Sequence, residues 1–230
     1  GHIGNAIQPL AVHSTAGAGN GLWYTYTMEG IGNINFPPYN GLYYLDLATN
    51  APVEFLPPTD ALGGISPNQA LIAYGPGQGG APGIIMGGFY VRDLLTCGQT
   101  YIAYNPASNL GGGYMTFSPD NRMVAWVEAS GPDNMNASFR LRVARTDGTG
   151  LVDSPAASLS GLLGGEAFTF LKPVGWIANH VLVLEIYSPS LNQNVLVVWA
   201  PDPAQPLDPV LGANQSAPLG TGSFLGFLYP

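Results

Sequence analysis

The sequence predicts an all-β fold assembled from repeated four-stranded units, and two observations carry this prediction. The first is composition: of 230 residues, 32 are glycine and 21 are proline, while 46% are hydrophobic. Such a chain has enough apolar residues for a core, but it is interrupted too often for long helices. The second is a phrase that occurs twice, ISPNQALIAY at 65–74 and FSPDNRMVAW at 117–126.

The repeated phrase combines a tight turn with a buried strand. Ser118 suits the first position of a type I turn, Pro119 has the φ of the second position, and Asp120 and Asn121 tolerate the conformations that follow. The segments MVAW and LIAY then have the aliphatic and aromatic residues of a strand that is buried on both faces. A looser third copy, GWIANHVLVL, occupies 175–184.

A hairpin is predicted downstream of each phrase. The clearest turn signal is Asp147-Gly148. One unit is therefore four strands joined by a tight turn, a variable loop and a second tight turn. The four predicted hairpins cover residues 41–58, 88–106, 139–155 and 194–210.

Repeats of this length are typical of β-propellers and solenoids. The first unit lacks a copy of the phrase, and the strand-like piece 222–230 has no successor, so this piece is a candidate for the first strand of the first blade and would close the ring. The segment AIQPLAVHS at 6–14 competes for the same place. We predict one β-propeller domain over 1–230 with about four blades: 20–58 plus 222–230, 63–106, 113–157 and 167–215.

The segment FSPDNRMVAWVEA and the later FRLRVARTDGTG resemble the TolB-type or WD-repeat-like β-propeller repeat. In that repeat an aromatic-S-P-D-G-x phrase begins one strand and a later strand ends in a D-G turn. The likeness is strong over 117–150, good over 65–106, and elsewhere limited to the layout. It implies a binding platform that is periplasmic, extracellular or on the cell surface. TolB-like propellers typically have six blades, so about four blades imply either a small closed propeller or a partial one.

The net charge of the chain limits the classes of partner that we expect. The chain has 6 basic and 14 acidic side chains and a net charge of -8, which argues against binding a phosphate backbone. Only 9% of the residues are charged, and such a weakly charged surface is more usual outside the cytoplasm. No apolar run approaches the roughly 20 residues that span a bilayer. We expect a protein partner, with carbohydrate as the second class, no nucleic acid and no membrane-spanning segment.

Motifs for catalysis are not evident. The chain has no nucleophile elbow, P-loop or dinucleotide fingerprint, and its three histidines are too far apart for metal-ligand spacing. We therefore predict no catalytic residue, metal ligand or cofactor. Glu128 and Glu185 follow strands at comparable places, and two carboxylates are the machinery of glycosidases. The other interpretation is that Glu128 and Glu185 simply lie at exposed strand ends.

Long, diverse loops join the second and third strands of each unit, whereas the turns between the first and second strands and between the third and fourth are mostly tight. Loops of this kind on a rigid scaffold often bind ligands, although tolerated insertions would look the same. We expect an extracytoplasmic binding module or scaffold, a subunit or accessory of a larger envelope or surface assembly. A carbohydrate-active propeller enzyme with paired carboxylates is the alternative. The predicted binding residues on the long-loop face are Phe36, Tyr39, Met86, Asn134, Met135 and Asn192.

Overall fold

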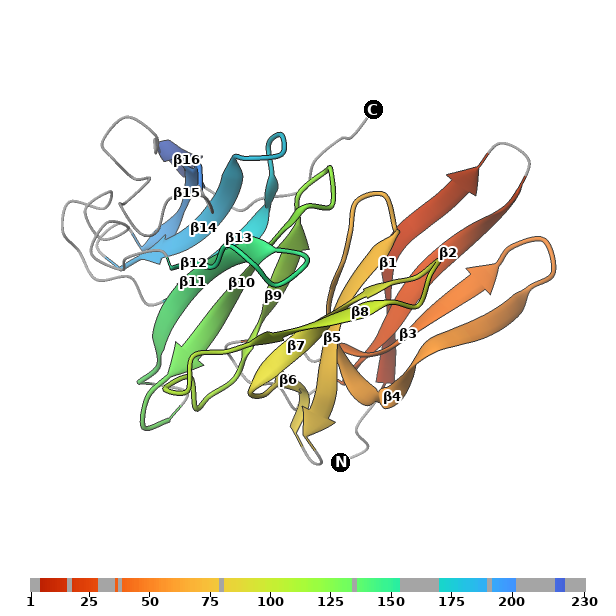
Figure 1. The fold of residues 1–230 in the computed structure, drawn as a ribbon, viewed down its shortest axis with the longest axis horizontal. Helices are drawn as coiled ribbons and strands as arrows, with labels where there is room; N and C mark the ends of the chain where they lie inside the picture. The colour runs from red at the N-terminus through yellow and green to blue at the C-terminus, as the bar shows by residue number, and fades with distance from the viewer. Residues whose placement is uncertain are drawn as a thin grey trace.

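The computed structural model describes most of the chain, and all of its regular secondary structure there is β-strand (Figure 1). Every strand pairing described is antiparallel, which agrees with the hairpins that the sequence predicts. The residues described are 5–15, 18–28, 36, 39–78, 81–133, 136–153, 170–189, 192–201 and 218–221.

The first unit consists of four strands in chain order. Strand β1 pairs with β2, so residues 6–14 occupy the place beside β2 for which 222–230 was the other candidate. Residues 222–230 lie outside the described residues, and no described sheet closes on itself. The strands are β1 (Asn5–Thr15), β2 (Ala18–Met28), β3 (Tyr39–Asp46) and the first part of β4 (Ala51–Ile65).

Strand β4 belongs to two units. Leu56 is paired with Leu42 of β3, whereas Leu62 is paired with Tyr74 of β5. Pairing with β5 begins at Asp60, and Ala61 is paired both with Asn40 of β3 and with Gly75 of β5. The second unit is the end of β4 with β5 (Leu71–Gln78), β7 (Gly88–Asp93) and β8 (Gln99–Ala103).

The interval 75–87 is not the simple loop that the sequence predicts. Strand β5 continues to Gln78, and β6 (Ala81–Ile85) pairs with β5 and, through Ile85, with β9. Ile85 is 1% exposed and packs in the core between two units. Burial of this β-branched side chain explains the extra strand, because the strand is stabilised by tertiary packing that its glycine-rich flanks do not reveal.

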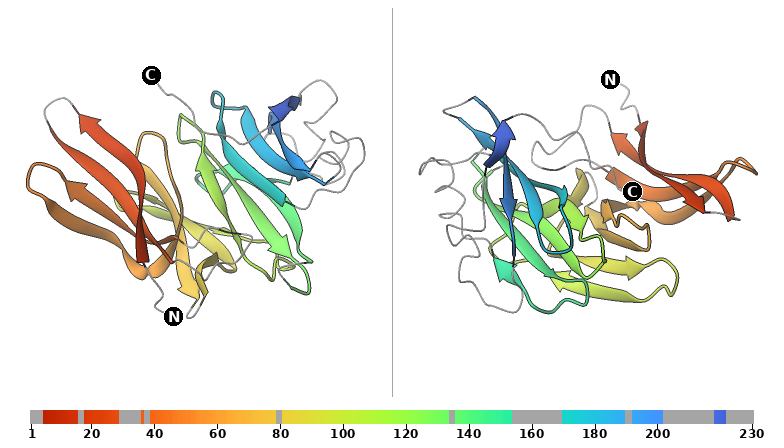
Figure 2. Two further views of the ribbon diagram at one scale, coloured as in Figure 1. Left: turned by 180° about the vertical axis from the view of Figure 1, so that it is seen from behind. Right: turned by 90° about the horizontal axis from the view of Figure 1, so that it is seen from above.

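The third and fourth units repeat the same arrangement. Figures 1 and 2 show the units side by side in chain order, with the first and fourth at opposite ends. The third unit contains β9 (Gly112–Phe117), β10 (Met123–Ser130), β11 (Ser138–Arg145) and β12 (Val152–Asp153). The fourth contains β13 (Phe170–Trp176), β14 (Leu182–Ser188), β15 (Gln193–Trp199) and β16 (Pro218–Thr221).

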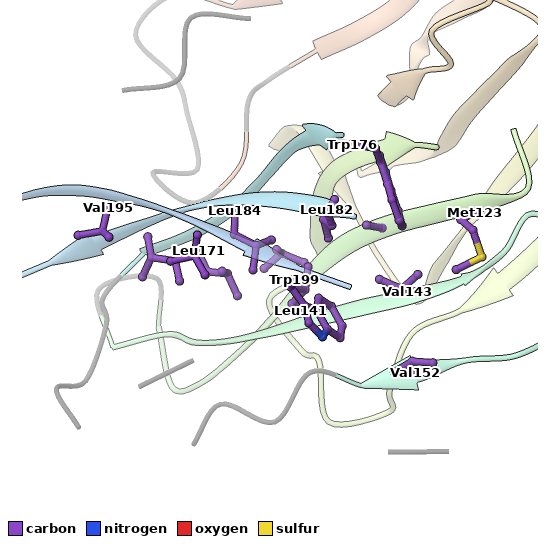
Figure 3. Close-up of a cluster of buried hydrophobic side chains, with 14 of the residues drawn as sticks. Met123, Leu141, Val143, Val152, Leu171, Trp176, Leu182, Leu184, Val195 and Trp199 are labelled. Carbon is purple, nitrogen blue, oxygen red and sulfur yellow. The ribbon is translucent and has the colours of Figure 1, made fainter. Parts of the chain in front are cut away.

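Three buried clusters lie between successive units. Trp23 and Ile72 pack between the first two units, and Phe89 and Trp126 between the second and third. Figure 3 shows the cluster between the third and fourth units, which includes Trp199. Each inner unit is therefore apolar on both faces, which explains why strands such as β10 are buried along nearly their whole length.

The repeated phrase forms the turn that its sequence predicts. Ser118 Oγ accepts a hydrogen bond from Met123 N at 2.9 Å and donates one to Asp120 Oδ1 at 2.7 Å. Ser66 makes the equivalent bonds in the earlier copy. Asn121 Nδ2 also donates to Asn68 Oδ1 at 2.7 Å, so the two copies of the turn contact each other.

Candidate functional site

A hollow of about 430 Å³ lies where the first strands of the second, third and fourth units come together. Its wall is formed by the end of β4, by β9 and by β13, and the first residue of β3 completes it. The lining residues are Tyr39, Gly63, Gly64, Tyr114, Met115, Thr116, Lys172, Pro173 and Val174.

Close approach of the backbones forms one side of this hollow. A Cβ atom at Gly64 would lie 2.2 Å from the carbonyl oxygen of Met115, so only glycine allows β4 and β9 to come this near. On the other side, Trp176 Nε1 donates a hydrogen bond to Thr116 O at 3.2 Å and ties the fourth unit to β9. The hollow is thus positioned by fixed contacts between strands.

Tyr114 adopts an unusual conformation at the wall of the hollow. Its φ is 56°, and a β-bulge displaces the register of β9 between the partners of Ala125 and Val127. A bulky residue with positive φ is rare, and such strain is concentrated at functional sites. Burial, with smaller contributions from Tyr39 and Glu185, raises the pKa of Tyr114 to about 12.

Lys172 brings a positive charge to the same wall and is the only lysine in the chain. Its Nζ lies 5.7 Å from the centre of the Tyr114 ring, within range of a cation–π interaction. Glu185 of β14 is the register partner of Lys172 and accepts a hydrogen bond from Asn194 Nδ2. An ammonium group and two phenols around a partly apolar hollow are suited to hold an anionic group, such as a carboxylate, that is attached to an apolar body.

The predicted binding residues of the long-loop face lie in different environments. Tyr39 lines the hollow, and burial raises its pKa. Phe36 is 2% exposed and packs in the core with its ring 5.6 Å from that of Tyr114, so its side chain is not part of the surface. Met86 is half-buried, and Asn192 is exposed and accepts a hydrogen bond from Tyr187. The predicted residues Asn134 and Met135 lie outside the described residues.

Glu128 is engaged in a buried network rather than lying at an exposed strand end. It is 1% exposed, and Arg142 Nη1 donates to its Oε1 at 2.9 Å. Trp126 Nε1 donates to the same oxygen at 2.9 Å, and Ser108 Oγ and Asn105 N donate to the other. These bonds connect the segment after β8 to β10 and β11.

The two candidate carboxylates face different sides of their units. Glu128 lies on the same side of β10 as Trp126, which packs against the second unit. In β14, Leu184 and Ile186 pack against the third unit, so the alternation of side chains places Glu185 on the other face of β14, where its charge still acts on Tyr114. The structure therefore does not bring Glu128 and Glu185 to one face.

The sequence did not single out Tyr114, Gly63 or Gly64. Their arrangement depends on the bulge in β9 and on the packing of β4, neither of which has a local signal. Within the described ranges, no three His, Cys, Asp or Glu side chains gather as metal ligands would. The part of the chain that is described also contains no helix with the length and apolar character needed to cross a membrane.

Comparison with known proteins identifies the fold. No family model and no curated protein sequence matches the chain. A TolB-type protein from Agrobacterium tumefaciens superposes with a TM-score of 0.50 at 13% sequence identity, over 86% of this chain and 61% of that one. The fold is that of a TolB-like β-propeller.

Two further solved structures are similar to this chain. TolB from Acinetobacter baumannii superposes with a TM-score of 0.47 at 14% identity, over 78% of this chain and 38% of that one. The tricorn protease has a TM-score of 0.44 at 13% identity, over 91% of this chain and 25% of its own. The chain thus spans less than two thirds of the length of each.

Proposed function

We propose that the chain is a non-enzymatic, extracytoplasmic binding module that recognises a partner protein as a subunit or accessory of a larger envelope or surface assembly. The four units of antiparallel strands support a propeller of about four blades, each made of four strands. The observation that carries the proposal is the hollow at the first strands, where Lys172 and Tyr114 lie side by side.

The chemistry of the hollow favours binding of a partner's acidic or carboxylate-bearing segment. The chain has a net charge of -8 and a single lysine, and that lysine is placed at the wall of the hollow. Tyr39 and Tyr114 add aromatic rings, while Met115, Pro173 and Val174 add apolar surface. Aromatic residues beside a well-placed charge are the usual anchors of protein recognition.

The alternative, a carbohydrate-active enzyme, has less support. Among the described lining residues of the hollow none is a carboxylate, and Glu128 and Glu185 face different sides of their units. Glu128 is also committed to a buried ion pair with Arg142.

The test is affinity capture from an envelope extract of the source organism. The immobilised chain is compared with Lys172→Gln and with the control Arg122→Gln, a charge loss at a side chain that is 83% exposed. We expect one protein to be retained by the wild type and the control but not by Lys172→Gln. Equal retention by all three, or retention of none, would contradict the proposal. Release of sugar from envelope polysaccharide by the wild type would favour the enzyme instead.

A further inference from the structure

The face of the first unit that is directed away from the second unit is rich in tyrosine. In β2, Trp23 packs in the core with the second unit, so its neighbours in the strand lie on the opposite face. The register of β1 and β3 adds residues from both sides of β2. We define the tyrosine face as Ile7, Val12, Leu22, Tyr24, Tyr26, Tyr43 and Leu45.

Three aromatic rings form the centre of this face and contact one another. The rings of Tyr24 and Tyr43 are stacked with centroids 5.3 Å apart, and Tyr26 meets Tyr43 edge-on at 5.1 Å. At the margin, Ile7 and Val12 are 62% and 66% exposed. Tyr24 is 8% exposed and Tyr26 and Tyr43 are half-buried, so a partner reaches the rings of Tyr26 and Tyr43 together with the exposed aliphatic side chains at the margin.

The two faces of this unit differ in chemical character. The inner face has Trp23, Leu42 and Leu56, which pack permanently against the second unit. The tyrosine face instead has rings that end in hydroxyl groups. Such amphipathic rings tolerate water and also bury well, which is why tyrosine is common in interfaces that form and dissociate. A partly exposed face of aromatic and aliphatic side chains is typical of an interaction surface.

Electrostatics and backbone chemistry indicate what kind of partner fits. The first lysine or arginine of the chain is Arg92, so the whole first unit lacks both residue types. Glu54 is the register partner of Tyr43 and contributes, after burial, to a raised pKa of that tyrosine. A cationic segment is therefore complementary in charge. Pro9 interrupts the exposed edge of β1 and cannot donate to a ladder, which disfavours a partner that adds a further strand.

We propose that the tyrosine face binds an extended, proline-rich segment of another protein that also carries arginine or lysine. Prolines in a polyproline II helix pack on aromatic rings, and the carbonyl groups of that helix have no internal donors and accept hydrogen bonds from tyrosine hydroxyls. The cationic side chain pairs with Glu54. This surface is separate from the hollow at Lys172, so the two proposals stand independently.

The test is fluorescence anisotropy of the intact chain with a labelled peptide that has prolines at PxxP spacing and arginines at one end. We expect saturable binding that weakens about tenfold or more in Tyr43→Ala. Tyr43→Phe, which keeps the ring, should weaken it by a smaller factor. Glu54→Gln should weaken it about two- to threefold at low salt. Circular dichroism of each variant checks that the fold is retained.

Two controls make the result specific. Tyr101→Ala removes a tyrosine of the second unit that is 51% exposed and should leave the affinity unchanged. The same peptide with alanine in place of proline should bind at least about tenfold more weakly. Absence of saturable binding would overturn the proposal, as would equal effects of Tyr43→Ala and Tyr101→Ala. So would a Tyr43-dependent self-association in sedimentation, or Tyr43-dependent binding of an oligosaccharide without binding of the peptide.

Discussion

Arg142 and Glu128 form an ion pair inside the protein, with Arg142 Nη1 2.9 Å from Glu128 Oε1 and both side chains at most 7% exposed. Arg142 Nε also contacts Asp153 Oδ1 at 2.5 Å, so one guanidinium joins β10, β11 and β12. Burial opposes the charge of Arg142, but the hydrogen bonds and charges of Glu128 and Asp153 outweigh it and raise the pKa of this side chain.

Glu128→Gln should destabilise the protein strongly, because it removes the fully buried countercharge of Arg142 and leaves only Asp153, whose side chain is 28% exposed, as the anionic partner of the guanidinium. We expect a loss of about 3–5 kcal/mol in the free energy of unfolding, measured by urea denaturation. Arg140→Ala is the matched control: Arg140 also pairs with Asp153, but its side chain is 47% exposed, so its loss should cost less than about 1 kcal/mol. Similar losses for both variants would show that the buried pair has no special role.

Gly64→Ala should destabilise the contact between β4 and β9. The added methyl group would overlap the carbonyl oxygen of Met115, and we expect a loss of about 1–3 kcal/mol from the resulting backbone shift. Gly98→Ala is the comparison, because its Cβ would meet only Thr96 Oγ1 at 3.3 Å. If both variants kept the wild-type midpoint in a thermal melt, the close approach of β4 and β9 at Gly64 would not contribute to stability, and the prediction would be wrong.

Ser118→Ala should lose the two hydrogen bonds that fix the repeated turn. Ser118 is fully buried, so Met123 N would be left without its side-chain acceptor. We expect a loss of about 1–3 kcal/mol in the free energy of unfolding. Ser66→Ala should have a similar effect, because Ser66 Oγ accepts from Leu71 N at the same 2.9 Å distance. A large difference between the two variants would contradict the equivalence of the turns.

Tyr114 should make stability depend on pH in the alkaline range. Its pKa is about 12 in the folded protein against 10.0 for an unperturbed tyrosine. The folded state therefore retains a proton that the unfolded state releases, and the contribution to stability declines as the pH rises from 10 toward 12. Unfolding by urea across this range should show a shallower decline in Tyr114→Phe than in the wild type. Identical slopes would mean that Tyr114 is not held in its neutral form.

Much of the strand layout follows from the sequence alone. The Ser-Pro-Asp/Asn phrase predicts a turn because its side chains bond to nearby backbone groups, and Ser118 and Asp120 accept such bonds from Met123 N and Arg122 N. The aliphatic and aromatic run after the turn predicts a buried strand, and β10 is one. Strand β6 was missed because the burial of Ile85 is a tertiary effect.

The candidate site was less predictable than the fold. Tyr39 was named from its loop, but Tyr114 was not, because nothing local indicates that it takes a φ of 56°. Lys172 was conspicuous as the one lysine, yet its position over the Tyr114 ring requires β9 and β13 to be neighbours. Glu128 seemed a candidate for chemistry until its partners Arg142, Trp126 and Ser108 were located.

The sequence by itself determined the all-β class, the repeated unit and its turns, since these depend on residues that are close along the chain. The tertiary structure alone decided that β1 lies beside β2, that Phe36 is buried, and that Tyr114 and Lys172 share a hollow. The physical reason is that these features arise from contacts between units. Such contacts depend on bulges, on close backbone approach and on the packing of faces, and no short stretch of sequence encodes them.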